Sequence, residues 1–272
     1  MCDLTGCGVD DERPLPAVTD EERRSFLKGA AALPLATVLA YPEFAAAAAH
    51  TVRPFAIALD DIEATGYVAM PDKFPAPTLL LIHEWWGLND NIKAVAADFA
   101  AKGYIAAAID LYGGKRAKTR PEAKKLKNGV DKKNADKQVR GVLDWLSRHR
   151  KGNRKVGTVG WCFGGGWSLN ASLLAPVDAT VIYYGSVKKK AKDLELLTGP
   201  VMGHFGTKDK RINASMVGAF EKEMKRAGKN DLTVHWYVAD HAFANPTGSR
   251  YDAEDAALAW TRTLTFFEKH LR

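Results

Sequence analysis

Short runs of apolar residues alternate along the chain with longer segments in which apolar residues recur at helical spacing. Six runs have the length and continuous apolarity of buried strands, at residues 78–83, 104–109, 156–160, 180–184, 201–205 and 232–238. Helical spacing covers residues 90–102, 135–148, 164–174, 213–227 and 252–271. Strands that are apolar on both sides and alternate with helices pack as a parallel sheet covered on both faces. The pattern predicts an α/β fold with a mostly parallel central sheet and helices on both faces.

One connection between these elements is unusually polar. Residues 113–133 are rich in lysine and glycine and separate a predicted strand from a predicted helix. Long connections of this kind are often functional. We expect this segment to form a lid or a rim over a site.

The first 49 residues have a different pattern. A charged segment at residues 22–28 precedes an apolar run at residues 29–41 and a stretch of small residues at 45–49. This order is typical of a secretory signal, and the Arg23-Arg24 pair resembles the twin-arginine export motif. The apolar run is far shorter than the roughly 20 residues of a membrane span. We therefore expect residues 1–49 to be a removed or disordered signal segment, residues 50–272 to be one domain, and the protein to be periplasmic or otherwise exported.

Composition agrees with one soluble domain. Hydrophobic residues make up 46% of the chain, and no later apolar run is long enough to cross a membrane. The net charge is +7, and loss of the eight acidic and four basic residues among the first 49 would raise it to +11. Basic residues concentrate between residues 115 and 155 without regularly interleaved aromatics, which argues against nucleic-acid binding. A solvated helical face, or weak attraction of anionic substrates or surfaces, accounts better for this charge.

Cysteine usage focuses attention on one position. Two of the three cysteines, Cys2 and Cys7, lie in the predicted signal segment, so residues 50–272 contain Cys162 alone. This domain has no internal disulfide, and a lone thiol in an oxidising compartment is a liability unless it is buried or used.

The residues around Cys162 have the pattern of a nucleophile elbow. Gly160 and Gly164 flank the cysteine at the spacing G-x-C-x-G, between a short apolar strand and a helical segment. This sharp turn would expose the thiol above the sheet. It would also aim the backbone N–H groups of Cys162 and Phe163 at a thiolate or a developing oxyanion. On this motif alone, a buried thiol in an ordinary glycine-rich turn remains an alternative.

Two further polar residues follow apolar runs. Asp209 comes after residues 201–207, and His241 comes after residues 232–239. Functional residues of open parallel sheets lie beyond the carboxyl ends of the strands, and the order nucleophile, acid, histidine is that of α/β-hydrolases. His241 would take the thiol proton, and Asp209 would fix the imidazole. Asp240 is the rival acid, disfavoured because neighbouring side chains diverge.

Several ordered blocks also carry a family resemblance. They are residues 83–92, 103–104, 110–112, 159–166, 183–185, 204–209, 241–243 and 250–251. Across residues 55–271 the chain resembles the dienelactone hydrolase (carboxymethylenebutenolidase) family of α/β-hydrolases. The resemblance implies a Cys162–Asp209–His241 triad that works without a cofactor.

The resemblance also implies roles around the triad. Glu84 would contact the thiol and help govern its activation, and the backbone N–H groups of Trp85 and Phe163 would form the oxyanion hole. No metal is expected, because His83-Glu84 lacks a second histidine four residues on.

Two departures from the family bear on the substrate. Family members that act on dienelactone hold its carboxylate with two arginines, and the corresponding positions here are Gly114 and Asn245. Lys115 or Arg116 could replace the first, but nothing replaces the second in register, so a small carboxylated lactone fits poorly.

Aromatic residues suggest the walls of the pocket. Four tryptophans surround the motifs, at positions 85, 86, 161 and 167, and we expect Trp86, Tyr112 and Asn245 to line the substrate pocket. The sequence predicts a monomeric thiol hydrolase for a small ester or lactone. The alternatives are a general carboxylesterase of another substrate and a non-catalytic envelope binding protein that retains the fold.

Overall fold

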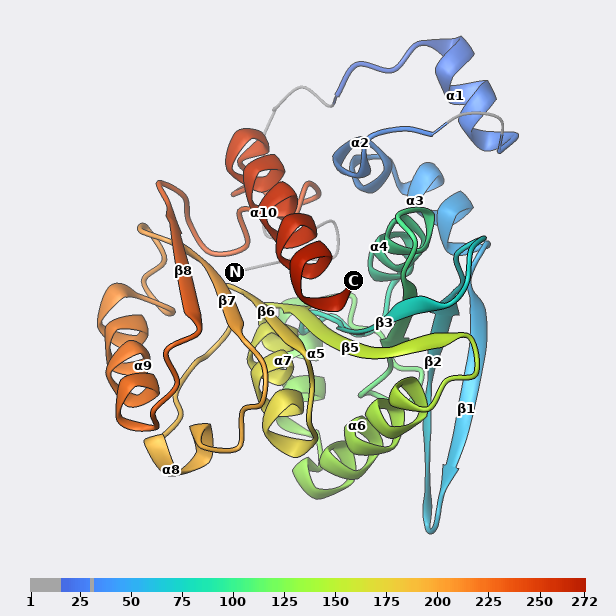
Figure 1. The fold of residues 1–272 in the computed structure, drawn as a ribbon. Helices are drawn as coiled ribbons and strands as arrows, with labels where there is room; N and C mark the ends of the chain where they lie inside the picture. Colours follow the sequence, from blue (N-terminus) through green and yellow to red (C-terminus); the bar gives the residue numbers. More distant parts are fainter. Residues whose placement is uncertain (1–15, 30–31) are drawn as a thin grey trace.

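A single sheet of eight strands forms the centre of the computed structural model, which describes residues 16–29 and 32–272 (Figure 1). The strands are β1 Arg53–Leu59, β2 Ile62–Ala69, β3 Ala76–Ile82, β4 Ile105–Ile109, β5 Gly152–Trp161, β6 Ala179–Tyr183, β7 Val201–Gly206 and β8 Leu232–Tyr237. Their order is β1-β2-β4-β3-β5-β6-β7-β8. The pairs β1–β2 and β2–β4 are antiparallel, and the remaining neighbours are parallel.

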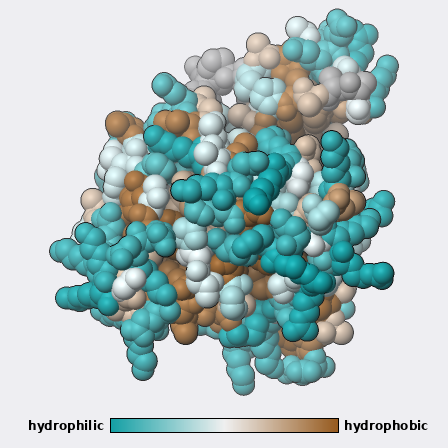
Figure 2. All heavy atoms as spheres, in the orientation of Figure 1, coloured by the Kyte–Doolittle hydropathy of each residue, from teal (hydrophilic) through white to brown (hydrophobic). Residues whose placement is uncertain are grey.

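Helices cover both faces of the sheet. Those of the main domain are α4 Asp90–Ala101, α5 Arg120–Asn128, α6 Lys132–Ser147, α7 Phe163–Leu174, α8 Ala191–Leu194, α9 Ala214–Arg226 and α10 Ala253–Leu271. In Figure 1, α4 and α10 lie on one side of the sheet, and α6, α7 and α9 lie on the other. Figure 2 shows hydrophilic side chains projecting around the periphery of the visible face.

The pleat of β3 divides the core between the two layers. Every residue of this strand is buried. Leu79 and Leu81 join the apolar cluster that contains Phe99 of α4 and Phe267 of α10, whereas the alternate residue Leu80 joins the cluster that contains α6 side chains. Successive side chains of a strand point to opposite faces, so a strand between two helical layers must be apolar throughout. The predicted fold class is confirmed.

The edge of the sheet was not predicted. β1 and β2 form a hairpin that turns at Asp60 and Asp61, and β1 is largely exposed or half-buried. Phe55, Ile57 and Leu59 alternate with more exposed positions, which is the weak signal of a half-buried strand. The polar connection at residues 113–133 also contains α5, which begins with a capping box between Thr119 and Glu122.

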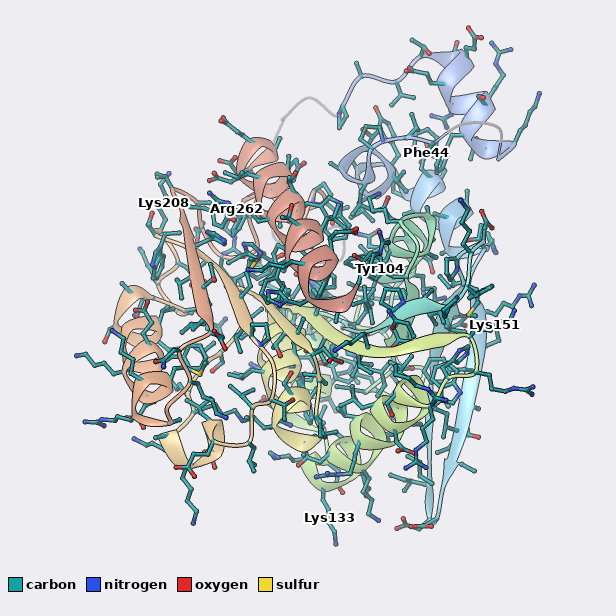
Figure 3. All side chains as sticks on the ribbon, viewed as in Figure 1. Phe44, Tyr104, Lys133, Lys151, Lys208 and Arg262 are labelled. Carbon is teal, nitrogen blue, oxygen red and sulfur yellow. The ribbon has the colours of Figure 1, made fainter. Side chains whose placement is uncertain are left out.

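The N-terminal segment forms three short helices, α1 Asp20–Leu27, α2 Leu35–Ala40 and α3 Pro42–Ala49. α3 packs on α4, and Phe44 is completely buried between the N-terminal helices and the domain (Figure 3). Arg23 pairs with Glu43 at 2.8 Å. These contacts belong to the chain with its first 49 residues present, so the removal of that segment stays a prediction. Cys2, Cys7 and residues 30–31 of the apolar run lie outside the described residues.

In the part of the chain that the structure describes, no helix is both long and apolar enough to span a bilayer.

The buried ring of Phe44 predicts that residues 42–49 stabilise the full-length protein. Phe44→Ala should lower its free energy of unfolding by about 3 kcal/mol, the usual cost of emptying a buried aromatic site. Leu27 is 46% exposed, so Leu27→Ala is a control that should change stability little. Denaturant unfolding of the full-length variants measures both, and equal stabilities would show that α3 does not pack as described.

Candidate active site

Cys162 lies at a sharp turn between β5 and α7. Its φ of 56° and ψ of −110° belong to a strained region that residues with a side chain rarely occupy. A Cβ on Gly160 would lie 2.1 Å from the Gly164 carbonyl oxygen, and a Cβ on Gly164 would lie 2.0 Å from the Ile82 carbonyl oxygen. Only glycine allows these approaches, so the two glycines let α7 begin directly against β3 and β5. The nucleophile elbow geometry predicted from the sequence is present.

Three side chains form one continuous hydrogen-bonded chain at the carboxyl ends of the strands. His241 Nε2 lies 3.2 Å from Cys162 Sγ, and His241 Nδ1 lies 2.6 Å from Asp209 Oδ2. The other oxygen of Asp209 accepts hydrogen bonds from the backbone N–H groups of Arg211 and Ile212 at 2.8 and 3.0 Å. Asp240 instead accepts from the His241 backbone N–H at 2.6 Å. The carboxylate on the imidazole is therefore Asp209.

The charges of this chain favour an ion pair. Burial of His241 opposes its protonation, but the Cys162 sulfur and the Asp209 carboxylate outweigh this effect and raise the pKa of His241 to about 10. Burial raises the pKa of Asp209, whereas the hydrogen bonds to its carboxylate lower it. The bonds from His241, Ile212 and Arg211 prevail and lower the pKa of Asp209. Near neutral pH the site thus favours a protonated imidazole beside the ionised carboxylate of Asp209.

The backbone N–H groups near the Cys162 sulfur differ in whether they already donate a hydrogen bond. The N–H of Cys162 donates to the Tyr183 carbonyl oxygen at 3.0 Å, so the prediction that it would face an oxyanion is wrong. The N–H groups of Trp85 and Phe163 donate to no other described residue. Phe163 is the first residue of α7, where helix N–H groups have no partner within the helix. Tyr112 donates its hydroxyl to the Trp85 carbonyl oxygen at 3.2 Å and so holds the Trp85 peptide.

Glu84 follows β3 and is buried beside the site. Its Oε2 accepts a hydrogen bond from Asn245 Nδ2 at 3.0 Å, whereas its Oε1 has no partner among the described residues. Desolvation raises the pKa of Glu84 to about 6, although the charge of His241 and the bond from Asn245 oppose the rise. Among the described residues the Cys162 sulfur is hydrogen-bonded to His241 and the Glu84 carboxyl to Asn245, so Glu84 and the thiol share no hydrogen bond, and the role of Glu84 in thiol activation stays a prediction.

A cleft of about 380 Å³ opens above Cys162. Trp85, Phe163 and Trp167 form its aromatic wall, and His241 lies beside the thiol. This confirms part of the predicted aromatic lining.

The structure corrects the rest of the predicted pocket. Trp86, Trp161 and Asn245 line a small neighbouring cavity of about 40 Å³ that also contains Glu84. Tyr112 faces a separate hollow with Lys115 and Arg116, so neither basic residue faces the thiol cleft.

Tyr184 is a site residue that the sequence interpretation missed. It lines both the cleft and the cavity of Glu84, and its hydroxyl is buried with no partner among the described residues. Burial, with the charges of Glu84 and Cys162, raises its pKa well above the ordinary tyrosine value. It follows β6 directly, so the rule that sites lie at the carboxyl ends of strands was the signal that could have found it.

Among the described residues, no group of three or more His, Cys, Asp or Glu side chains is arranged to hold a metal ion.

The sheet topology, the elbow cysteine and the Asp–His pair at the following strand ends define the protein as an α/β-hydrolase. Residues 64–271 match the dienelactone hydrolase family, so the chain belongs to this family and is a hydrolase.

Known proteins with related sequences and structures agree. The chain is 32% identical to protein usf of Aquifex pyrophilus, over 77% of this chain and 95% of the relative. It is 30% identical to a carboxymethylenebutenolidase of Pseudomonas putida, over 73% of this chain and 88% of the relative. The crystal structure of a dienelactone hydrolase from Anabaena variabilis has the same fold, with a TM-score of 0.59 at 20% identity over 82% of this chain and all of that one.

The buried carboxyl of Glu84 predicts a pH-dependent loss of stability. Its pKa rises from 4.5 to about 6 on folding, so between these pH values the folded state binds more protons than the unfolded state. Stability from this group is complete below pH 4.5 and is lost as the pH rises through 6, by about 2 kcal/mol in total. Glu84→Gln cannot titrate. The difference in unfolding free energy, variant minus wild type, should therefore rise by that amount between pH 4 and pH 7.5.

Denaturant unfolding of both proteins over this pH range measures the difference. Parallel stability curves would contradict a raised pKa of Glu84.

Proposed function

We propose that this protein hydrolyses a carboxylic ester or lactone through an acyl-cysteine intermediate. Cys162 is the nucleophile, His241 is the general base and acid, and Asp209 holds His241. The observation that carries the proposal is the unbroken chain from Asp209 Oδ2 through the imidazole to Cys162 Sγ, with distances of 2.6 and 3.2 Å. A nucleophile, a base and an orienting carboxylate in hydrogen-bond reach are the parts that acyl transfer needs.

In the acylation step, the Cys162 thiolate attacks the carbonyl carbon and forms a C–S bond. The carbonyl oxygen becomes an oxyanion, which the N–H groups of Trp85 and Phe163 stabilise. When the tetrahedral intermediate collapses, the C–O bond to the alcohol breaks and His241 gives its proton to the leaving oxygen. The products of this step are the free alcohol, or the ring-opened hydroxyl of a lactone, and a thioester on Cys162.

In the deacylation step, neutral His241 takes a proton from a water molecule, and the resulting hydroxide attacks the thioester carbon. The C–S bond breaks, the carboxylic acid leaves, and Cys162 returns to the thiolate beside protonated His241. Glu84 influences this cycle through charge, because its carboxylate and the imidazole interact electrostatically. Asn245 sets the position of the Glu84 carboxyl through their 3.0 Å hydrogen bond.

The substrate differs from a small carboxylated lactone. Gly114 and Asn245 occupy the positions of the two arginines that hold dienelactone in the family members that act on it, and Lys115 and Arg116 face another hollow. The aromatic wall formed by Trp85, Phe163 and Trp167 supports an acyl or alkyl group with apolar surface.

Cys162→Ala tests the chemistry. Hydrolysis of activated nitrophenyl esters and simple lactones should fall by at least about 10³-fold, because the nucleophile is removed. Mass spectrometry of quenched wild-type enzyme should show one acyl group on Cys162 and none on the variant. The thermal unfolding midpoint of the variant provides the control for folding. Equal rates in both proteins would remove Cys162 as the nucleophile.

We also propose that residues 1–49 direct export by the twin-arginine route and that the exported chain begins near His50. The charged segment, apolar run and small residues occur in the order of such signals. Cleavage near His50 would remove Phe44, and with it the contact of α3 on α4.

Replacement of Arg23 and Arg24 by lysine together should abolish export while preserving both charges. Cell fractionation of a bacterium that has the twin-arginine route measures the periplasmic share. N-terminal sequencing of the exported chain locates the cleavage site. Undiminished export of the double variant, or a periplasmic chain that retains residues 20–49, would reject the proposal.

A further inference from the structure

The thiol cleft carries an unusual charge. Six of its sixteen lining residues are cationic and none is acidic. They come from four segments that converge at the cleft: α5 with the start of α6, the segment after β6, the segment before α9 and the segment before α10. They are Lys127, Lys132, Lys188, Lys189, Arg211 and Arg250. A concave surface lined by one sign of charge concentrates ligands of the opposite sign. The proposed ester chemistry at Cys162 does not by itself require this charge.

Most of these cations are not neutralised by the protein. Lys132 pairs with Asp136 at 2.5 Å, and Arg250 lies 4.0 Å from Asp240. Lys127, Lys188, Lys189 and Arg211 form no ion pair with a carboxylate of the described residues. Other lysines of this chain differ in placement: Lys133 extends from the start of α6 away from the molecule (Figure 3).

Lys189 is the most buried of these four unpaired cations, since Lys127, Lys188 and Arg211 are exposed. It is half-buried, and its ammonium donates to Asn170 Oδ1 at 3.1 Å. Asn170 in turn donates to Asp136 Oδ1 at 2.9 Å, and Asp136 Oδ2 holds Lys132. An ammonium has three N–H donors, and this network uses one of them on Lys189. The network therefore fixes the position of the amine while leaving donors for a ligand.

The electrostatic surroundings of Lys189 favour an incoming anion. Burial and the nearby charge of Lys132 lower its pKa, against the attraction of Asp193 and Asp136. The two carboxylates only partly offset the positive charge, and Asp136 is already engaged with Lys132 and Asn170. A bound anion would relieve this excess of positive charge.

The position of Asn170 on α7 indicates how far Lys189 lies from the thiol. Asn170 follows Cys162 by eight residues along α7, and both line the cleft. At 1.5 Å per residue this separation is about 12 Å along the helix axis. An anion held by Lys189 is thus separated from the scissile carbonyl by an extended chain and not by the width of a small ring.

We propose that Lys189, with Lys188 and Arg211, forms an anion subsite at the end of the thiol cleft, so that the preferred substrate is an extended ester with a terminal carboxylate. This rests on the proposed ester hydrolysis at Cys162 and adds the substrate class. The subsite lies after β6 and beside α7, away from positions 114 and 245, where the family members that act on dienelactone carry their arginines.

Two esters of matched length test the subsite. They are the mono-nitrophenyl ester of suberic acid, which has a terminal carboxylate, and nitrophenyl octanoate, which lacks it. Wild-type enzyme should have the higher kcat/KM for the anionic ester. In Lys189→Gln the ratio of the two kcat/KM values should fall roughly tenfold, because the side chain keeps a donor for Asn170 and loses the charge.

Three controls accompany this comparison. Lys222 is exposed on α9 outside the cleft, so Lys222→Gln has the same charge change and should keep the wild-type ratio. Added salt should lower the wild-type ratio, because it screens a partly exposed subsite. The mono-nitrophenyl ester of succinic acid should gain little from Lys189, because its carboxylate is too close to the scissile bond to reach the amine.

The outcomes separate this inference from the proposed function. An unchanged ratio in Lys189→Gln, or equal losses for both esters, would overturn the subsite and leave ester hydrolysis intact. If wild-type enzyme hydrolyses neither ester, protection of Cys162 from alkylation decides whether the subsite exists. Suberate should then slow alkylation of Cys162 by iodoacetamide in the wild type and not in Lys189→Gln. Absence of that protection would also overturn the subsite.

Discussion

The turn at Cys162 combines a left-handed backbone, with φ of 56°, and two contacts that leave no space for a side chain at Gly160 and Gly164. These contacts let α7 start against the end of β3, so the backbone strain at Cys162 is imposed by the packing of α7 on a strand that is buried throughout. The thiol is displayed because the turn cannot relax without moving α7 off the sheet. His241 and Asp209 gain their roles only because the thiol is held at this point.

The hydrogen bonds that link Asp209, His241 and Cys162 favour the protonated form of His241. Burial alone would leave His241 neutral, but the Cys162 sulfur and the Asp209 carboxylate reverse the preference and raise the pKa of His241 to about 10. Glu84 shows the opposite balance: the charges of His241 and Arg250 and the hydrogen bond from Asn245 offset only part of the desolvation, so the pKa of Glu84 rises to about 6. Desolvation is thus outweighed at His241 and prevails at Glu84.

The cleft adds a second level of electrostatics. Its cations belong to α5 and the first residue of α6, to the segment after β6, and to the segments that precede α9 and α10, which the sheet order brings together above Cys162. The aromatic wall provides apolar contact near the thiol, and Lys189 lies toward the far end. This arrangement supports a substrate with an apolar middle and a charged end, in place of the compact anion that two arginines would hold.

Sequence and structure contributed differently to the site. The meeting of Cys162, Asp209 and His241 could be predicted from the sequence, because each directly follows a continuous apolar run and the carboxyl ends of parallel strands share one edge. Tyr184 also directly follows a buried strand, so the same rule places it at the site. Trp86, Tyr112 and Asn245 were placed in the pocket from motif adjacency alone, and the structure places them along other cavities. Tyr112 is held there by the Trp85 carbonyl oxygen and Asn245 by Glu84, contacts that motif adjacency does not reveal.

By itself, the sequence determined the parallel sheet, its covering helices and the elbow, since these depend on local periodicity and on glycines that no other residue can replace. The β1–β2 hairpin was not predicted, because apolar and polar residues alternate only weakly in a half-exposed edge strand. Only the tertiary structure decided which N–H groups remain free beside the thiol and which lysines converge on the cleft. The choice of Asp209 over Asp240 is not among these, because it followed from the sequence and the structure agrees with it. The free N–H groups among the described residues and the converging lysines depend on segments that are distant in sequence, and their meeting is fixed by the order and twist of the strands.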